Sequence, residues 1–142
     1  MEDSVPSEYF PGGRTRPRKF YIVDDDEDDR MFIKEAFQTV LGDVEIVEET
    51  NGQDFLKALE RDKSDRKSLV ICTDMNMPKI DGFEIIEFLQ SQNEYRHIPV
   101  FMISTTSSKE LIDKAYKLGV RKYFVKPYKT CEYSLIIKEI SS

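Results

Sequence analysis

Short apolar runs alternate with segments of helical periodicity along most of the chain. Each run has the length of a buried strand and precedes a segment whose apolar residues recur every three or four positions. The pattern predicts five strands, each followed by a helix. The predicted strands are Phe20–Val23, Val44–Thr50, Leu69–Thr73, Val100–Ile103 and Tyr123–Val125.

Local signals predict how some of these elements begin and which way they face. Asp28 or Asp29 is expected to cap the first helix, because aspartate is a preferred N-cap residue. Asn51-Gly52 is typical of a turn. In the last helix, the spacing predicts an inner face that carries Leu135, Ile136 and Ile140.

Repeated strand–helix units predict an α/β fold with a parallel sheet covered by helices on both faces. Right-handed crossovers and short connections favour a flavodoxin-like, doubly wound (βα)5 fold with strand order 2-1-3-4-5. In that order, ligands bind at the carboxyl ends of the first and third strands. Residues 1–18 lack periodicity and contain several Pro and Gly residues, so we expect a flexible tail before one domain at 19–142.

Composition narrows the classes of function. The formal net charge of -6 argues against general nucleic-acid binding. No apolar run approaches the roughly 20 residues that a membrane helix needs, and the N-terminus lacks the apolar segment of a signal peptide. The two cysteines, Cys72 and Cys131, match no metal or redox spacing. A cytoplasmic protein is therefore expected.

Polar residues follow four of the five predicted strands. Asp24 and Asp25 come after the first, Asp74 after the third, Ser104 after the fourth and Lys126 after the fifth. Three carboxylates at one sheet edge would repel one another, and a divalent cation such as Mg²⁺ or Mn²⁺ would remove that conflict. A cation, a lysine and a hydroxyl can together hold phosphoryl oxygens, and a carboxylate can accept the phosphoryl group.

Each of these residues alone is weak evidence. An aspartate after a strand is often only a helix cap, and a single lysine or serine is usually a surface residue. Their joint occurrence at four strand ends is much harder to attribute to chance.

Four motifs carry a resemblance to a known family. They are Ile-Val-Asp-Asp-Asp at 22–26, Asp-Met-Asn-Met-Pro-Lys-Ile-Asp-Gly at 74–82, Met-Ile-Ser-Thr-Thr at 102–106 and Tyr-Phe-Val-Lys-Pro-Tyr at 123–128. In this order they resemble the response-regulator receiver domain of two-component signalling, of the single-domain chemotaxis-regulator type. The resemblance covers residues 19–141.

The resemblance implies a role for each residue at the sheet edge. Asp74 would be the phospho-acceptor, and Asp25, Asp74 and the Asn76 backbone carbonyl would bind Mg²⁺. Asp24 would bind the metal through water. The phosphoryl oxygens would be held by Ser104 and Lys126.

The resemblance also implies a switch and its timing. Ser104 would move toward the phosphoryl group, and Tyr123 would turn inward and change the surface of the fourth helix, fifth strand and fifth helix. Asn76 and Thr106 would set the lifetime of the phosphorylated form. Pro127 would follow a cis peptide bond after Lys126.

The expected function is that of a phospho-acceptor rather than an enzyme with a small-molecule substrate. A sensor histidine kinase or a histidine phosphotransfer protein would supply the phosphoryl group, and a protein target would read it. Because the chain ends directly after the fifth helix, we expect a stand-alone receiver or a piece of a larger regulator. The alternatives are a phosphorylation-independent interaction module, an aspartyl-nucleophile phosphatase and a flavin binder on the same fold.

Overall fold

The computed structural model describes residues 19–141, in which five strands form one parallel sheet. The strand order is β2-β1-β3-β4-β5, so the predicted flavodoxin-like topology is confirmed. The predicted tail at 1–18 lies outside the described residues. The strands are β1 (Lys19–Val23), β2 (Glu45–Glu49), β3 (Leu69–Thr73), β4 (Val100–Ser104) and β5 (Lys122–Val125).

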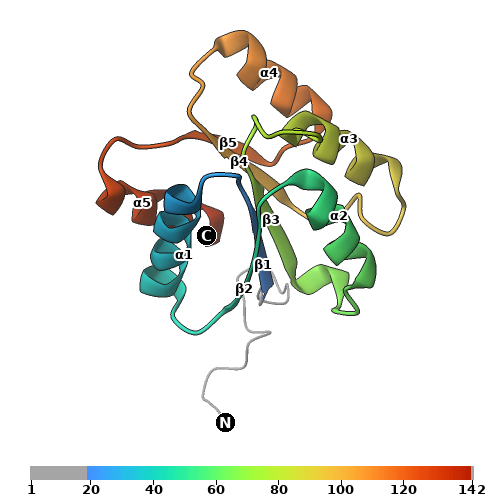
Figure 1. Ribbon diagram of the computed structural model, residues 1–142, viewed down its shortest axis with the longest axis horizontal. Helices are drawn as coiled ribbons and strands as arrows, with labels where there is room; N and C mark the ends of the chain where they lie inside the picture. Colours follow the sequence, from blue (N-terminus) through green and yellow to red (C-terminus); the bar gives the residue numbers. More distant parts are fainter. Residues whose placement is uncertain (1–18, 142) are drawn as a thin grey trace.

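Helices cover both faces of the sheet, as the doubly wound fold predicts (Figure 1). One face is covered by α1 (Glu27–Leu41) and α5 (Tyr133–Ser141). The other is covered by α2 (Gly52–Arg61), α3 (Gly82–Ser91) and α4 (Lys109–Leu118). Two short 3₁₀ turns, at Arg66–Ser68 and Thr130–Glu132, precede β3 and α5.

The alternation of side chains along β1 divides the core into two parts. Phe20 and Ile22 pack with α1 and α5, whereas Tyr21 and Val23 pack with α2 and α3. Successive side chains of a strand point to opposite faces, so an apolar strand between two helical layers is buried throughout. The central strand β3 shows this most clearly, because all five of its residues are buried.

One predicted helix cap and one predicted turn are wrong in detail. Asp26 caps α1, with its Oδ1 accepting a hydrogen bond from the Asp29 amide at 3.0 Å; neither Asp28 nor Asp29 is the cap. The predicted turn at Asn51-Gly52 is instead the start of α2, since the Asn51 side chain accepts from the Asp54 amide at 2.8 Å. In both cases a short polar side chain satisfies an otherwise unpaired amide of the first turn.

The predicted inner face of α5 is also partly wrong. Leu135 is 61% exposed and was wrongly placed on this face, whereas Ile136 is buried and Ile140 packs against the core as predicted; Tyr133 and Ile137 complete this face. Tyr133, Ile136, Ile137 and Ile140 recur every three or four positions on one face of α5, which leaves Leu135 on the solvent side.

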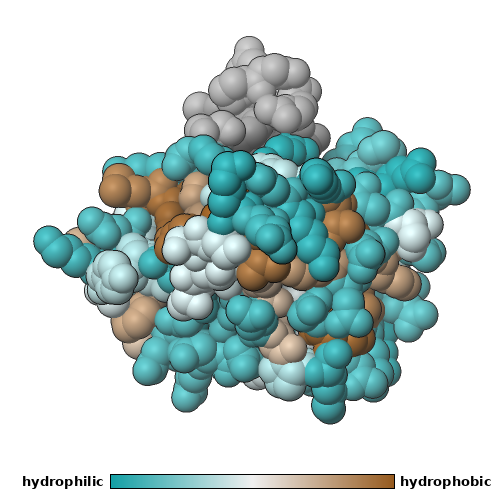
Figure 2. Space-filling model, turned by 90° about the horizontal axis from the view of Figure 1, so that it is seen from above, coloured by the Kyte–Doolittle hydropathy of each residue, from teal (hydrophilic) through white to brown (hydrophobic). Residues whose placement is uncertain are grey.

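Hydrophilic residues cover most of the face seen in Figure 2, and hydrophobic residues appear between them in small groups. Large hydrophobic side chains that remain exposed among residues 19–141 include Tyr116, Val125, Tyr128 and Leu135. Within the same residues, no helix is long and apolar enough to cross a membrane.

Candidate phosphoryl-transfer site

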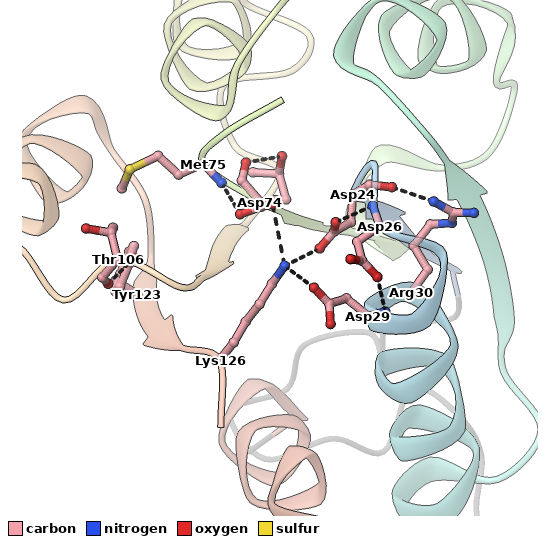
Figure 3. Close-up of polar contacts among 10 residues, drawn as sticks. Asp24, Asp26, Asp29, Arg30, Asp74, Met75, Thr106, Tyr123 and Lys126 are labelled. Carbon is pink, nitrogen blue, oxygen red and sulfur yellow. Dashed lines mark hydrogen bonds and ion pairs between the residues drawn. The ribbon is translucent and has the colours of Figure 1, made fainter. Parts of the chain in front are cut away.

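The sheet ladder continues one residue past β1 and β3 and fixes the backbone of both key aspartates. The Asp24 amide donates to the Glu49 carbonyl at 3.0 Å, and the Asp74 amide donates to the Val23 carbonyl at 2.9 Å. The Arg30 guanidinium also donates to the Asp24 carbonyl at 2.7 Å. The carboxylates of Asp24 and Asp74 therefore project from rigid backbone at adjacent strand ends (Figure 3).

Three carboxylates meet at this edge. One oxygen from each of Asp24, Asp25 and Asp74 lies within 4.8 Å of the other two. Asp24 and Asp74 are buried, and Asp25 is exposed. Hard oxygen donors at this spacing, with an open side for water, fit Mg²⁺ or Mn²⁺. Asp26 takes no part in this group, because its side chain caps α1.

Lys126 points from the end of β5 into the same group (Figure 3). Its Nζ lies 2.6 Å from Asp29 Oδ2, 2.8 Å from Asp24 Oδ2 and 3.5 Å from Asp74 Oδ2. Its side chain is only 7% exposed. Burial alone would lower the pKa of Lys126, but the carboxylates of Asp24 and Asp29 raise it above its usual value, so the ammonium stays charged.

The pKa of Asp24 shows that one lysine does not neutralise all the carboxylates of this group. Burial raises the pKa of Asp24 to about 6, although Lys126 beside it acts in the opposite direction. Asp74 also raises this pKa through charge repulsion. A second positive charge beside Asp24 would hold it fully ionised, which a divalent cation would provide.

The predicted cis bond between Lys126 and Pro127 is wrong, because no peptide bond within residues 19–141 is cis. The trans form of an X–Pro bond is intrinsically favoured by about 0.5–1 kcal/mol. With a trans bond, the Lys126 amide still donates to the Ser104 carbonyl at 2.8 Å and the side chain still reaches the carboxylates. Its inward aim therefore does not depend on a cis bond.

The hydroxyl of Ser104 is fully buried, and it makes no hydrogen bond of ordinary geometry within the described residues. Leaving a buried hydroxyl unpaired costs roughly 1–3 kcal/mol, so its place at the sheet edge calls for a partner. Tyr123 already lies inward: it is 8% exposed, and its hydroxyl donates to the Thr106 carbonyl at 2.7 Å. Tyr123 therefore lies inward in this structure, as expected for one of the two predicted positions of this side chain.

The segment between Asp74 and α3 is tightly folded. The Asp74 Oδ1 accepts from the Met75 amide at 2.7 Å, and the Gly82 amide donates to the Met75 carbonyl at 2.9 Å. A Cβ on Gly82 would lie 2.4 Å from the Asp74 carbonyl oxygen, so only glycine fits there. Asn76 is exposed in this segment.

Asp29 is the site residue that the sequence interpretation missed. It was expected only as a possible cap, yet it makes the shortest of the three contacts with Lys126. Asp29 could have been predicted from the position at which α1 begins. With Asp26 as the cap, Asp29 falls in the first turn of α1, where side chains point back toward the sheet edge.

A family model described as "Response regulator receiver domain" matches residues 20–138. The chain belongs to the response regulator receiver family. Chemotaxis protein CheY1 of Helicobacter pylori is 32% identical over 110 residues, which are 78% of this chain and 86% of that protein. Chemotaxis protein CheY-3 of Vibrio cholerae is 33% identical over 110 residues, 78% of this chain and 81% of that one.

Solved structures of response regulators share the fold. The phosphorylated cyanobacterial phytochrome response regulator RcpA aligns with a TM-score of 0.78 and 27% identity, covering 87% of this chain and 91% of that one. The chemotaxis response regulator CheY4 of Vibrio cholerae aligns with a TM-score of 0.73 and 24% identity, covering 87% and 98%. This second likeness concerns the fold alone.

Proposed function

We propose that this receiver is a phospho-acceptor switch in which Asp74 accepts a phosphoryl group. The observation that carries the proposal is the convergence at one sheet edge of three carboxylates, a buried ammonium and a buried hydroxyl without a hydrogen bond. A structural ion pair would not need so many charges of one sign. A site for phosphoryl oxygens and a divalent cation accounts for all of them.

An Asp74 carboxylate oxygen would attack the phosphorus of a phosphohistidine on a sensor kinase or a phosphotransfer protein. The new O–P bond forms as the N–P bond breaks, and the imidazole that leaves takes up a proton. Mg²⁺ bound by Asp25, Asp74 and the Asn76 carbonyl, and through water by Asp24, would neutralise charge on the transferred group. Lys126 would orient one phosphoryl oxygen and remain protonated throughout.

The Ser104 hydroxyl is the group that would register the phosphoryl oxygens. It is buried at the sheet edge beside the Tyr123 side chain, and a phosphoryl oxygen would give it a hydrogen bond of ordinary geometry. Its movement would disturb the segment between Ser104 and Thr106, whose carbonyl at Thr106 holds the Tyr123 hydroxyl. In this proposal the switch acts through that contact, which ties the position of Tyr123 to the segment after Ser104.

The output would be read as a protein contact on α4, β5 and α5. Apolar side chains are exposed on these elements and the segment after β5: Tyr116 is 44%, Val125 46%, Tyr128 106% and Leu135 61% exposed. Single exposed apolar side chains are ordinary on protein surfaces, so their location on these elements is compatible with this contact rather than evidence for it. The target would be a protein rather than nucleic acid, acting in the cytoplasm.

Incubation with acetyl phosphate and Mg²⁺ tests the proposal, with modification measured by intact mass and by a phosphoprotein gel. The parent should be modified at one site, Asp74→Asn should not be modified, and Asp43→Asn should behave like the parent. Asp43 is a suitable control because it is an exposed acid. Equal modification of Asp74→Asn would refute the assignment of the acceptor.

The same samples report the lifetime. Asn76 and Thr106, which stand two residues after the acceptor and after the switch hydroxyl, contain no strong base to activate water. Phosphorylated protein should therefore still be detected after acetyl phosphate has been removed by hand. Complete loss before the first time point would contradict this assignment of the two residues.

A further inference from the structure

Three carboxylates compete for the ammonium of Lys126, and the competition is unequal. The contacts with Asp29 at 2.6 Å and Asp24 at 2.8 Å have the length of charge-assisted hydrogen bonds. The contact with Asp74 at 3.5 Å is longer and weaker. An ammonium has three donors, so two are held firmly away from the acceptor.

The backbone around Asp29 does not allow it to follow the lysine. Asp29 lies in the first turn of α1, and its amide donates to the Asp26 cap at 3.0 Å. The helix packs along α5, with Phe32 stacked on Tyr133. Asp29 is thus a carboxylate on a fixed element, 24% exposed, that draws Lys126 toward α1 (Figure 3).

Lys126 also has little freedom to choose another position. Its amide is bonded to the Ser104 carbonyl and its side chain is 7% exposed, so the Nζ can move only within the group of carboxylates. A closer approach to Asp74 must lengthen the contact with Asp29 or Asp24. Asp24 belongs to the proposed metal site, which leaves Asp29 as the contact that can be given up.

We propose that Asp29 is a positioning residue that holds the Lys126 ammonium back from Asp74 in the unphosphorylated protein and so competes with the phosphoryl group for this lysine. The inference rests on the proposed function and deepens it, since it gives a residue of α1 control over how readily Asp74 is phosphorylated. Asp29 also adds a negative charge beside the phosphoryl position, which acts in the same direction.

Beryllofluoride, a phosphoryl mimic, tests this with the full chain at saturating MgCl₂. Binding is followed by ¹H–¹⁵N NMR titration, and MgCl₂ is titrated separately into each protein without beryllofluoride. Asp29→Asn should bind beryllofluoride about 3- to 10-fold more tightly than the parent, because Lys126 loses its strongest competing partner. It should not bind Mg²⁺ more tightly, since a lysine freed toward Asp74 repels the cation.

Asp28→Asn is the matched control. Asp28 is exposed at the start of α1, next to Asp29, so this change removes the same charge. It should leave beryllofluoride affinity within about 2-fold of the parent. An equal gain in both variants would reduce the effect to general charge and overturn the inference. Should Asp29→Asn fail to fold, as judged by its NMR spectrum, Asp29→Ser makes the same test.

Other outcomes separate this inference from the proposed function. If the parent binds beryllofluoride and Asp29→Asn binds it equally or more weakly, the inference alone is overturned. A parent that does not bind beryllofluoride overturns the proposed function, and the inference with it.

Discussion

Replacement of Asp62 should cost more stability than any exposed acid, and the cost should depend on pH. Asp62 is 7% exposed at the amino end of the sheet. Its Oδ2 lies 2.8 Å from Lys19 Nζ and accepts from the Tyr21 hydroxyl, and its Oδ1 accepts from the Ser64 amide at 2.7 Å. Asp62→Ala leaves all three donors without this partner.

The magnitude follows from what remains after the change. Breaking a buried pair by removing one partner costs roughly 3–5 kcal/mol. Lys19 is 15% exposed and lies 3.6 Å from Glu45, so it can recover part of its interaction from that residue and from water. We therefore expect a loss of about 3 kcal/mol in the free energy of unfolding, most of it from the buried Tyr21 hydroxyl and the weakened Lys19 pair.

The pH dependence has a definite sign. Burial would raise the pKa of Asp62, but its contacts with Lys19, Ser64 and Tyr21 hold it well below its usual value. The stabilisation is then fully present above the unfolded-state pKa of about 3.9 and is lost as the pH falls through the lower folded-state value. The difference between parent and Asp62→Ala should be constant near neutral pH and shrink below about pH 4.

Urea unfolding followed by far-UV circular dichroism measures this difference, because the chain contains no tryptophan for fluorescence. The control is Asp65→Ala, an exposed acid in the same connection whose side chain accepts from the Lys67 amide at 3.0 Å. It should cost about 1 kcal/mol or less. A loss below about 1 kcal/mol for Asp62→Ala, or a difference that does not change with pH, would refute the reasoning.

Two further changes act on the segment after Asp74, and a third, at Gly42 after α1, is the control for the first. Gly82→Ala should destabilise the fold by about 1–3 kcal/mol and slow modification of Asp74, because its Cβ would overlap the Asp74 carbonyl. Urea unfolding measures the stability, and acetyl phosphate labelling measures the modification. Stability and labelling equal to those of the parent would contradict the clash. Gly42→Ala meets no atom within 4 Å and should change stability only through its φ of 76°. Lys79→Asn should raise stability by about 0.5–1 kcal/mol in urea, since Lys79 has a φ of 69° that asparagine tolerates better; a loss of stability would show that the lysine side chain contributes more than the strain.

The order of the strands could be predicted because periodicity identifies each element and parallel connections leave few topologies. The acids and the lysine of the site could be predicted for a related reason: residues that follow parallel strands share one edge. The inner face of α5 was also present in the sequence, since Tyr133, Ile136, Ile137 and Ile140 have helical spacing; the prediction chose Leu135 in place of Tyr133 and Ile137. Helix starts were less accessible. The difference between Asp26 and Asp29 as the cap depends on one hydrogen bond, which leaves no periodic signal.

Asp62 had no signal at all in the sequence. Its partners Lys19 and Tyr21 lie in β1, more than 40 positions earlier, and meet it only because α2 returns the chain to the amino end of the sheet. A single aspartate in a charged connection is normally a solvated residue. Such a contact depends on how the chain closes in space, which local pattern does not record.

The two ends of the sheet place a buried aspartate beside a lysine with opposite results. At the amino end, Lys19, a hydroxyl and an amide satisfy Asp62 and hold its pKa down, and nothing further is needed. At the carboxyl end, Asp24 shares Lys126 with two other carboxylates, and burial raises its pKa to about 6. Since the same fold can satisfy a buried acid completely, the unsatisfied charges at the carboxyl end are a property of that site. They distinguish the end at which the proposed cation and phosphoryl group would bind.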